Sequence, residues 1–109
     1  MKDQNTAPCI YMITALRRVD PHLPLDTRAM GYYFDNDTAV NAVLHNVDDI
    51  HEDGFYPFVV IEKIYPGLYP IPDEDDPDSE SWFFWDKIQE AFVPTVKPVP
   101  LLGRFGFFA

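Results

Sequence analysis

Hydrophobic and polar positions alternate along this chain with two different periods, one typical of strands and one typical of a helix. Residues 9–19 hold β-branched and aromatic side chains that favour a strand. Hydrophobic runs indicate further strands at 30–34, 55–65 and 82–85. The segment AFVPTVK at 91–97 would return as the hairpin partner of the last run. Because proline has no backbone N–H, Pro94 places this final strand at a sheet edge or at a bulge.

The clearest helical pattern follows the second of these strands, in the segment DNDTAVNAVLHNV. Asp35, Asn36 or Asp37 can cap its N-terminus, because their side chains accept hydrogen bonds from free backbone N–H groups. The pattern predicts one helix over residues 37–47. Its apolar stripe consists of residues that recur at helical spacing: Ala39, Val40, Val43, Leu44 and Val47.

The predicted order is β-β-α-β-β-β, which indicates an α+β fold with a single helix packed on an antiparallel sheet. The first two strands would form an antiparallel hairpin across a loop at 20–29, where two prolines and two aspartates disfavour regular structure. A length of 109 residues, with neither repeats nor a linker, indicates a single α+β domain over 1–109. Hydrophobic content of 47% suffices for one folded core.

Eighteen acidic residues against eight basic residues give a formal net charge of −10. This charge repels nucleic acids and anionic lipids, so we expect no direct nucleic-acid binding and no membrane binding. A basic protein surface, such as that of a host protein, is the partner that this charge favours, and association would be fast and sensitive to salt. The alternative is that the excess of acid serves solubility alone.

The single cysteine, Cys9, cannot form an internal disulfide and lies in the first predicted strand, where a buried and inert thiol is expected. The first residues lack the charged and then apolar pattern of a secretory signal. No apolar run reaches the length of about 18 residues that spans a membrane. We therefore expect a soluble cytoplasmic protein that is a monomer or a weak homodimer.

Sequence motifs for catalysis and metal binding are missing. The serines lie beside acidic residues without a nucleophile elbow, and the five glycines form no phosphate-binding loop. His45 and His51 have carboxylates nearby but lack the spacing of a zinc site. We therefore predict neither an enzyme nor a metal or cofactor site.

The most acidic stretch of the chain directly precedes its most aromatic one, in PIPDEDDPDSESWFFW at residues 70–85. Carboxylates there could face Lys and Arg on a partner, with an exposed aromatic ring as the anchor. The two tryptophans are three positions apart, so we expect them on opposite faces of a strand. The alternative is a solvated loop that leads into an ordinary core hairpin. The candidate partner-binding residues are Asp73, Glu74, Asp75, Asp76, Asp78, Glu80, Trp82 and Trp85.

A small set of arginines suggests a second candidate site, for a ligand with a phosphate group. Arginines near tyrosines can hold a phosphate bidentately and stack on a base. The residues of this candidate site are Arg28, Tyr32 and Arg104. The alternative is that these arginines form internal ion pairs with the surplus carboxylates.

Several short motifs lie along residues 10–100: R-x-x-G-Y-Y at 28–33, A-x-x-A-V-x-x-N at 39–46, D-I-x-E at 49–52, V-V-I-E at 59–62, G-x-Y at 67–69, W-x-x-W-D at 82–86 and K-P at 97–98. This set resembles a loose family of small uncharacterised proteins from bacteria and from their phages and mobile elements. The resemblance implies the same fold and a phage or mobile-element setting, and it carries over no catalytic residue. The DPHLPLD loop and the dense acidic run depart from the family pattern, which leaves a shared function open.

These observations lead to three hypotheses of function. The first is a small acidic protein-binding module of a phage or mobile element that inhibits a host nucleic-acid-binding defence complex. The second is a nucleotide-binding protein that sequesters its ligand through arginines and aromatic stacking. The third is a structural domain with no dedicated ligand.

Overall fold

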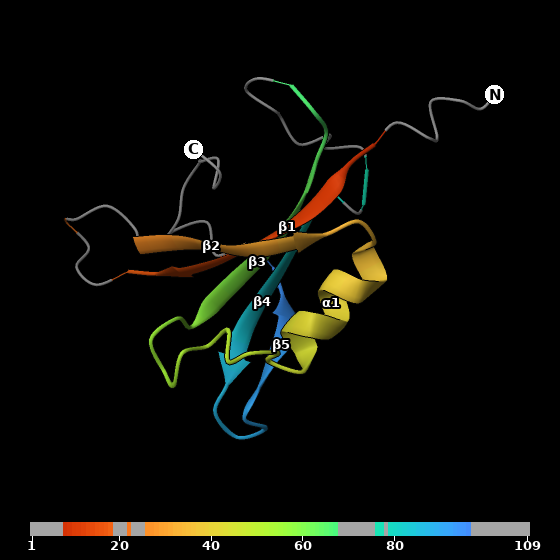
Figure 1. Ribbon diagram of the computed structural model, residues 1–109. Helices are drawn as coiled ribbons and strands as arrows, with labels where there is room; N and C mark the ends of the chain where they lie inside the picture. The colour runs from red at the N-terminus through yellow and green to blue at the C-terminus, as the bar shows by residue number, and fades with distance from the viewer. Residues whose placement is uncertain (1–7, 19–21, 23–25, 68–75, 78, 97–109) are drawn as a thin grey trace.

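A computed structural model shows one helix and one five-stranded sheet in the part of the chain that it describes, namely residues 8–18, 22, 26–67, 76–77 and 79–96 (Figure 1). The elements follow the predicted order and confirm the α+β class. They are β1 (Ile10–Arg17), β2 (Asp26–Tyr33), α1 (Asn36–Leu44), β3 (Phe58–Ile64), β4 (Glu80–Asp86) and β5 (Ala91–Thr95).

The strands lie in the order β2-β1-β3-β4-β5, and every neighbouring pair is antiparallel. The hairpin predicted between the first two strands is confirmed. β5 lies at an edge of the sheet, as Pro94 predicts, because a proline inside a central strand would remove a ladder hydrogen bond. In the described part of the chain, no helix has the length and apolar character needed to cross a membrane.

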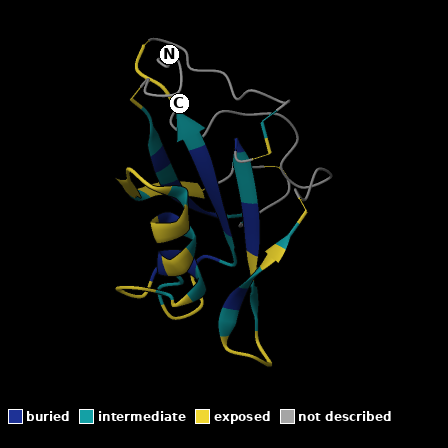
Figure 2. Cartoon of the chain, turned by 90° about the vertical axis from the view of Figure 1, so that its right-hand side faces the viewer, coloured by how far each residue is buried: buried dark blue, intermediate teal, exposed yellow. Residues whose placement is uncertain are grey.

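The main core lies between α1 and the sheet face that α1 covers (Figures 1 and 2). Alternate residues of the central strands point into it, because side chains alternate between the two faces of a strand. The helix contributes Ala39, Ala42 and Val43, and Val40 and Leu44 pack partly buried against the same core. The predicted apolar stripe therefore faces the core except at Val47, which lies beyond the helix and is exposed. From the sheet come Tyr11, Ile13, Ala15, Val59, Ile61, Phe83 and Phe92, and from the connection after the helix come Ile50 and Tyr56.

The opposite face of the sheet also holds buried side chains. Leu16, Val60 and Trp82 form a second cluster there, with Phe58 packed against it. Four consecutive residues of β3, Val59 to Glu62, are buried, so this strand is covered on both faces. The sequence of such a strand is typically a continuous apolar run, without alternation of apolar and polar residues.

The second strand starts earlier than the sequence predicts, at Asp26 instead of Met30. Residues 26–29 were expected in a loop but pair with β1, with Asp26 opposite Arg17 and Arg28 opposite Ala15. β2 is the other edge of the sheet, and its first four residues are exposed. A strand that is exposed on both faces needs no apolar positions. The segment DTRA therefore shows no hydrophobic pattern from which a strand could be predicted.

The helix is shorter than predicted and ends at Leu44 rather than at Val47. Its start is as expected, since the Asp35 side chain caps it by accepting a hydrogen bond from the Thr38 backbone N–H at 2.9 Å. At its end Asn46 takes a left-handed conformation with φ of 47°. The Val47 N–H then bonds to the Ala42 carbonyl at 2.9 Å and the Asn46 N–H to the Val43 carbonyl at 3.0 Å, which forms a Schellman motif.

Candidate functional site

The acidic stretch is only partly within the described residues. Asp73, Glu74, Asp75 and Asp78 lie outside them, whereas Asp76, Glu80 and both tryptophans lie inside. The assignment of this stretch as a partner-binding site stays a prediction for all eight residues. For the four described members, the structure shows specific internal contacts.

Asp76 forms an ion pair with Lys63 of β3, with 2.8 Å between the carboxylate oxygen and Nζ. The exposed fractions of the two side chains are only 23% and 18%. The hydrogen bond to Asp76 is the main reason why the pKa of Lys63 is raised above its usual value. The Lys63 backbone N–H also donates to the Ser79 carbonyl, and Ser79 N–H to the Asp76 carbonyl, both at 3.0 Å. Asp76 thus connects the acidic stretch to β3 through its contacts with Lys63 and Ser79.

The two tryptophans point to opposite faces of β4, as their spacing predicts. Trp82 belongs to the second cluster, is only 5% exposed and donates its indole N–H to the Glu80 carboxylate at 3.0 Å. Trp85 is half-buried against the main core. The ring of Trp82 is therefore buried. The aromatic side chains of β4 that remain accessible to solvent are Trp85 and Phe84, and Phe84 is 38% exposed.

The structure separates two residues of the candidate phosphate site. Directly opposed residues of an antiparallel pair share a face, and Arg28 is opposite Ala15 whereas Tyr32 is opposite Met12. Ala15 belongs to the core under α1, so Arg28 is on the helix side and Tyr32 on the other side. Four residues apart, they would share a face in a regular strand.

A β-bulge causes this separation. Ile13 pairs with Gly31 and Thr14 with Ala29, so Met30 is an extra residue in β2 and reverses the alternation beyond it. Arg28 instead forms an ion pair of 2.9 Å with Glu52, which fits the alternative of internal pairing. Arg104 lies outside the described residues. The structure thus places Arg28 and Tyr32 on opposite faces of the sheet, and their action on one ligand stays a prediction.

The connection from α1 to β3 is a chain of turns that the sequence interpretation treated as a simple helix end. Backbone N–H groups bond to carbonyls three residues earlier at Asn46, Asp49, Glu52 and Phe55, at 2.9–3.1 Å. Five non-glycine residues of this connection have positive φ: Asn46, Asp48, Asp49, Glu52 and Asp53. Asn and Asp tolerate this conformation best, so their density here reflects turn geometry. No group of three metal-ligating side chains occurs within the described residues.

His51 of this connection stacks on Trp85, which sequence reasoning did not foresee. The ring centroids are 3.8 Å apart and the planes differ by 8°. The Gly54 backbone N–H donates to His51 Nδ1 at 3.2 Å, so Nδ1 carries no proton in this arrangement. Burial lowers the pKa of His51, while the charges of Asp49 and Asp53 oppose the shift.

Acidification is therefore expected to destabilise the fold through His51. Its folded-state pKa lies below the unfolded value of about 6.5, so the unfolded state binds more protons as pH falls through this region and stability decreases. Urea unfolding at pH 7.5 and pH 5.5 should show this loss. His51→Phe, which keeps an aromatic ring for Trp85, should lose less stability over the same interval. Equal losses in the two proteins would contradict the role of His51.

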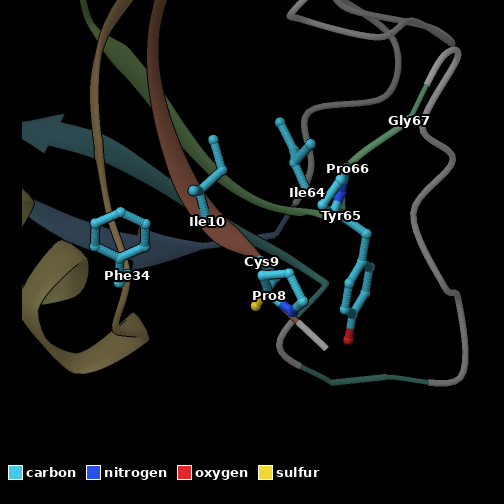
Figure 3. Close-up of a pocket in the computed structure, with 8 residues that line it drawn as sticks. All are labelled: Pro8, Cys9, Ile10, Phe34, Ile64, Tyr65, Pro66 and Gly67. Carbon is cyan, nitrogen blue, oxygen red and sulfur yellow. The ribbon is translucent and has the colours of Figure 1, made fainter. Parts of the chain in front are cut away.

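An apolar pocket lies at the end of the sheet where β1 begins and where β2 and β3 end (Figure 3). It has a volume of about 300 Å³. Cys9 is half-buried and lines this pocket just before β1, so the expectation that it is fully buried inside the first strand is wrong. The other principal lining residues are Ile10, Phe34, Ile64 and Tyr65.

Comparisons of the chain with protein-family models, with curated proteins and with solved structures found no match.

Proposed function

We propose that this protein is a small acidic module that binds a basic protein surface, and that its partner is a nucleic-acid-binding complex of a host defence system. The observation that carries the proposal is the net charge of −10. Arg17, Arg28 and Lys63 each pair with a carboxylate of the same chain, which neutralises these cations locally. A surface of this charge attracts the Lys- and Arg-rich grooves that bind nucleic acid.

The helix side supports the same function. From residue 29 to residue 61 the chain has six carboxylates and no lysine or arginine. All of them except Glu52 are exposed: Asp35, Asp37, Asp48, Asp49 and Asp53. We expect these charges to add a weaker, long-range attraction to a basic partner, while the acidic stretch makes the contact. The resemblance to phage and mobile-element proteins fits an inhibitor of host machinery.

The test compares two variants with the same charge. One replaces Asp73, Glu74, Asp75 and Asp78 with Asn or Gln, and leaves Asp76 and Glu80 in place because of their internal contacts. The matched control replaces four exposed carboxylates elsewhere, Asp37, Asp48, Asp53 and Glu90. Removing four negative charges takes each protein from −10 to −6.

We expect the wild type to capture nucleic-acid-binding proteins from a host lysate at low salt, and to release them when duplex DNA or high salt is added. The first variant should associate more slowly and with a weaker salt dependence than the control, because charges at the contact dominate steering. Equal losses in both variants would refute the acidic stretch as the binding site. Capture that neither salt nor DNA affects would refute the proposed function.

A further inference from the structure

The pocket at the end of the sheet is bordered by aromatic rings that the fold leaves exposed. Phe34 is 77% exposed, Tyr32 52% and Tyr65 43%. The rings of Tyr32 and Phe34 meet edge to face, with centroids 5.6 Å apart. Phe34 and Tyr65 also line the pocket (Figure 3). Exposed rings around a concave apolar site are the usual composition of a binding hot spot.

Most basic residues of the described chain lie at the other end of the sheet. β1 runs for eight residues from the pocket to Arg17, a distance of about 23 Å at 3.3 Å per residue. Arg28 pairs with Ala15 near that same far end, and Lys87 follows β4 there. At the pocket end the described cation is Lys63, which Asp76 already neutralises.

Carboxylates occur at the pocket end as well. Asp35 directly follows Phe34 and is exposed, and Asp37 is exposed one residue into the helix beyond it. Glu80 begins β4 and lies opposite Glu62, two residues before the end of β3. Apart from the paired Lys63, the described charged residues at this end of the sheet are therefore carboxylates, and a complementary partner has to combine an apolar group with positive charge.

We propose that this pocket is an anchor site for a protein segment that inserts one large apolar side chain flanked by lysine or arginine. The inference rests on the proposed function in one respect, namely that the partner is basic. The pocket supplies the apolar contact and selects the segment, while the carboxylates at this end of the sheet attract the flanking cations. Phe34 is the main contact, because it is the most exposed of the three rings.

Three synthetic peptides test this site by NMR titration of the whole protein. They are acetyl-Lys-Arg-Phe-Arg-Lys-amide, the same peptide with Ala in place of Phe, and acetyl-Glu-Asp-Phe-Asp-Glu-amide. We expect the first to bind about tenfold more tightly than the second, which is the effect of burying one large apolar side chain. The third should not bind, because its charge is repelled.

Cys9 gives a second readout, because it is the only cysteine of the chain and lines the pocket. The first peptide should slow the alkylation of Cys9 by iodoacetamide, and the alanine peptide should not. Phe34→Ala should weaken the first peptide several-fold and leave the alanine peptide unchanged. Ile88→Ala is the matched control, because Ile88 is 94% exposed in the turn after β4, at the far end of the sheet.

The outcomes separate this site from the proposed function. Equal, salt-sensitive binding of the two basic peptides would overturn the anchor site and support the general affinity for basic partners. Equal binding of the basic and acidic phenylalanine peptides would overturn the requirement for charge. Protection of Cys9 that rises with protein concentration in the absence of peptide would show that a second copy fills the pocket, and would also overturn the proposal.

Discussion

Val43→Asp is expected to unfold the protein. Val43 lies in the last turn of α1, one residue before its end at Leu44, is fully buried and packs in the main core. A carboxylate there would lose its hydration without gaining a partner, and would cost about 4 kcal/mol or more. Because small domains have a total stability of about 5–15 kcal/mol, this cost removes most or all of it. Circular dichroism and urea unfolding at pH 7 would measure the loss.

Val47→Asp is the matched control for this substitution. Val47 was expected on the same apolar stripe but lies beyond the helix and is 40% exposed. Aspartate there keeps much of its contact with water, so the variant should stay folded. If the two variants melted at similar temperatures, α1 would not cover the core as the structure shows.

The helix could be predicted from sequence because both its signals are local. The cap at Asp35 and the apolar spacing from Ala39 to Val43 depend on residues within a few positions of one another. The end of the helix was predicted three residues too late, because Val47 continues the apolar spacing. What ends the helix is the left-handed conformation of Asn46.

The edge strand and its bulge could not be predicted in the same way. Residues 26–29 form a strand because they pair with β1. Their side chains are exposed, so the sequence has no alternation of apolar and polar residues that would indicate this strand. The bulge at Met30 likewise exists only in the pairing with β1. For this reason the sequence placed Arg28 and Tyr32 in one site and the structure places them on opposite faces.

The pocket depends on the same kind of long-range information. Its walls come from the start of β1, the end of β2 and the end of β3. These three segments are far apart in the sequence, and which strand ends meet depends on the strand order. A strand order of β2-β1-β3 brings the three segments together. The acidic stretch, by contrast, is visible in the sequence without any knowledge of pairing.

Phe92→Ala is expected to give the second large loss of stability, about 3–5 kcal/mol. Phe92 is 1% exposed and lies opposite Trp85 in the pairing of β4 with β5. Its ring meets those of Trp85 and His51 edge to face, at centroid distances of 5.1 and 5.8 Å. Truncation would therefore remove the common neighbour of the stacked His51–Trp85 pair and leave a cavity under β5.

The position of β5 increases the effect of Phe92→Ala. This strand has five residues, pairs only with β4 among the described strands and contains Pro94, so its backbone hydrogen bonds alone hold it weakly. Phe84→Ala on the neighbouring strand is the control, because Phe84 is 38% exposed and should lose clearly less. Urea unfolding followed by tryptophan fluorescence would compare them. Similar losses for the two phenylalanines would mean that β5 is held by its backbone rather than by the aromatic cluster of His51, Trp85 and Phe92.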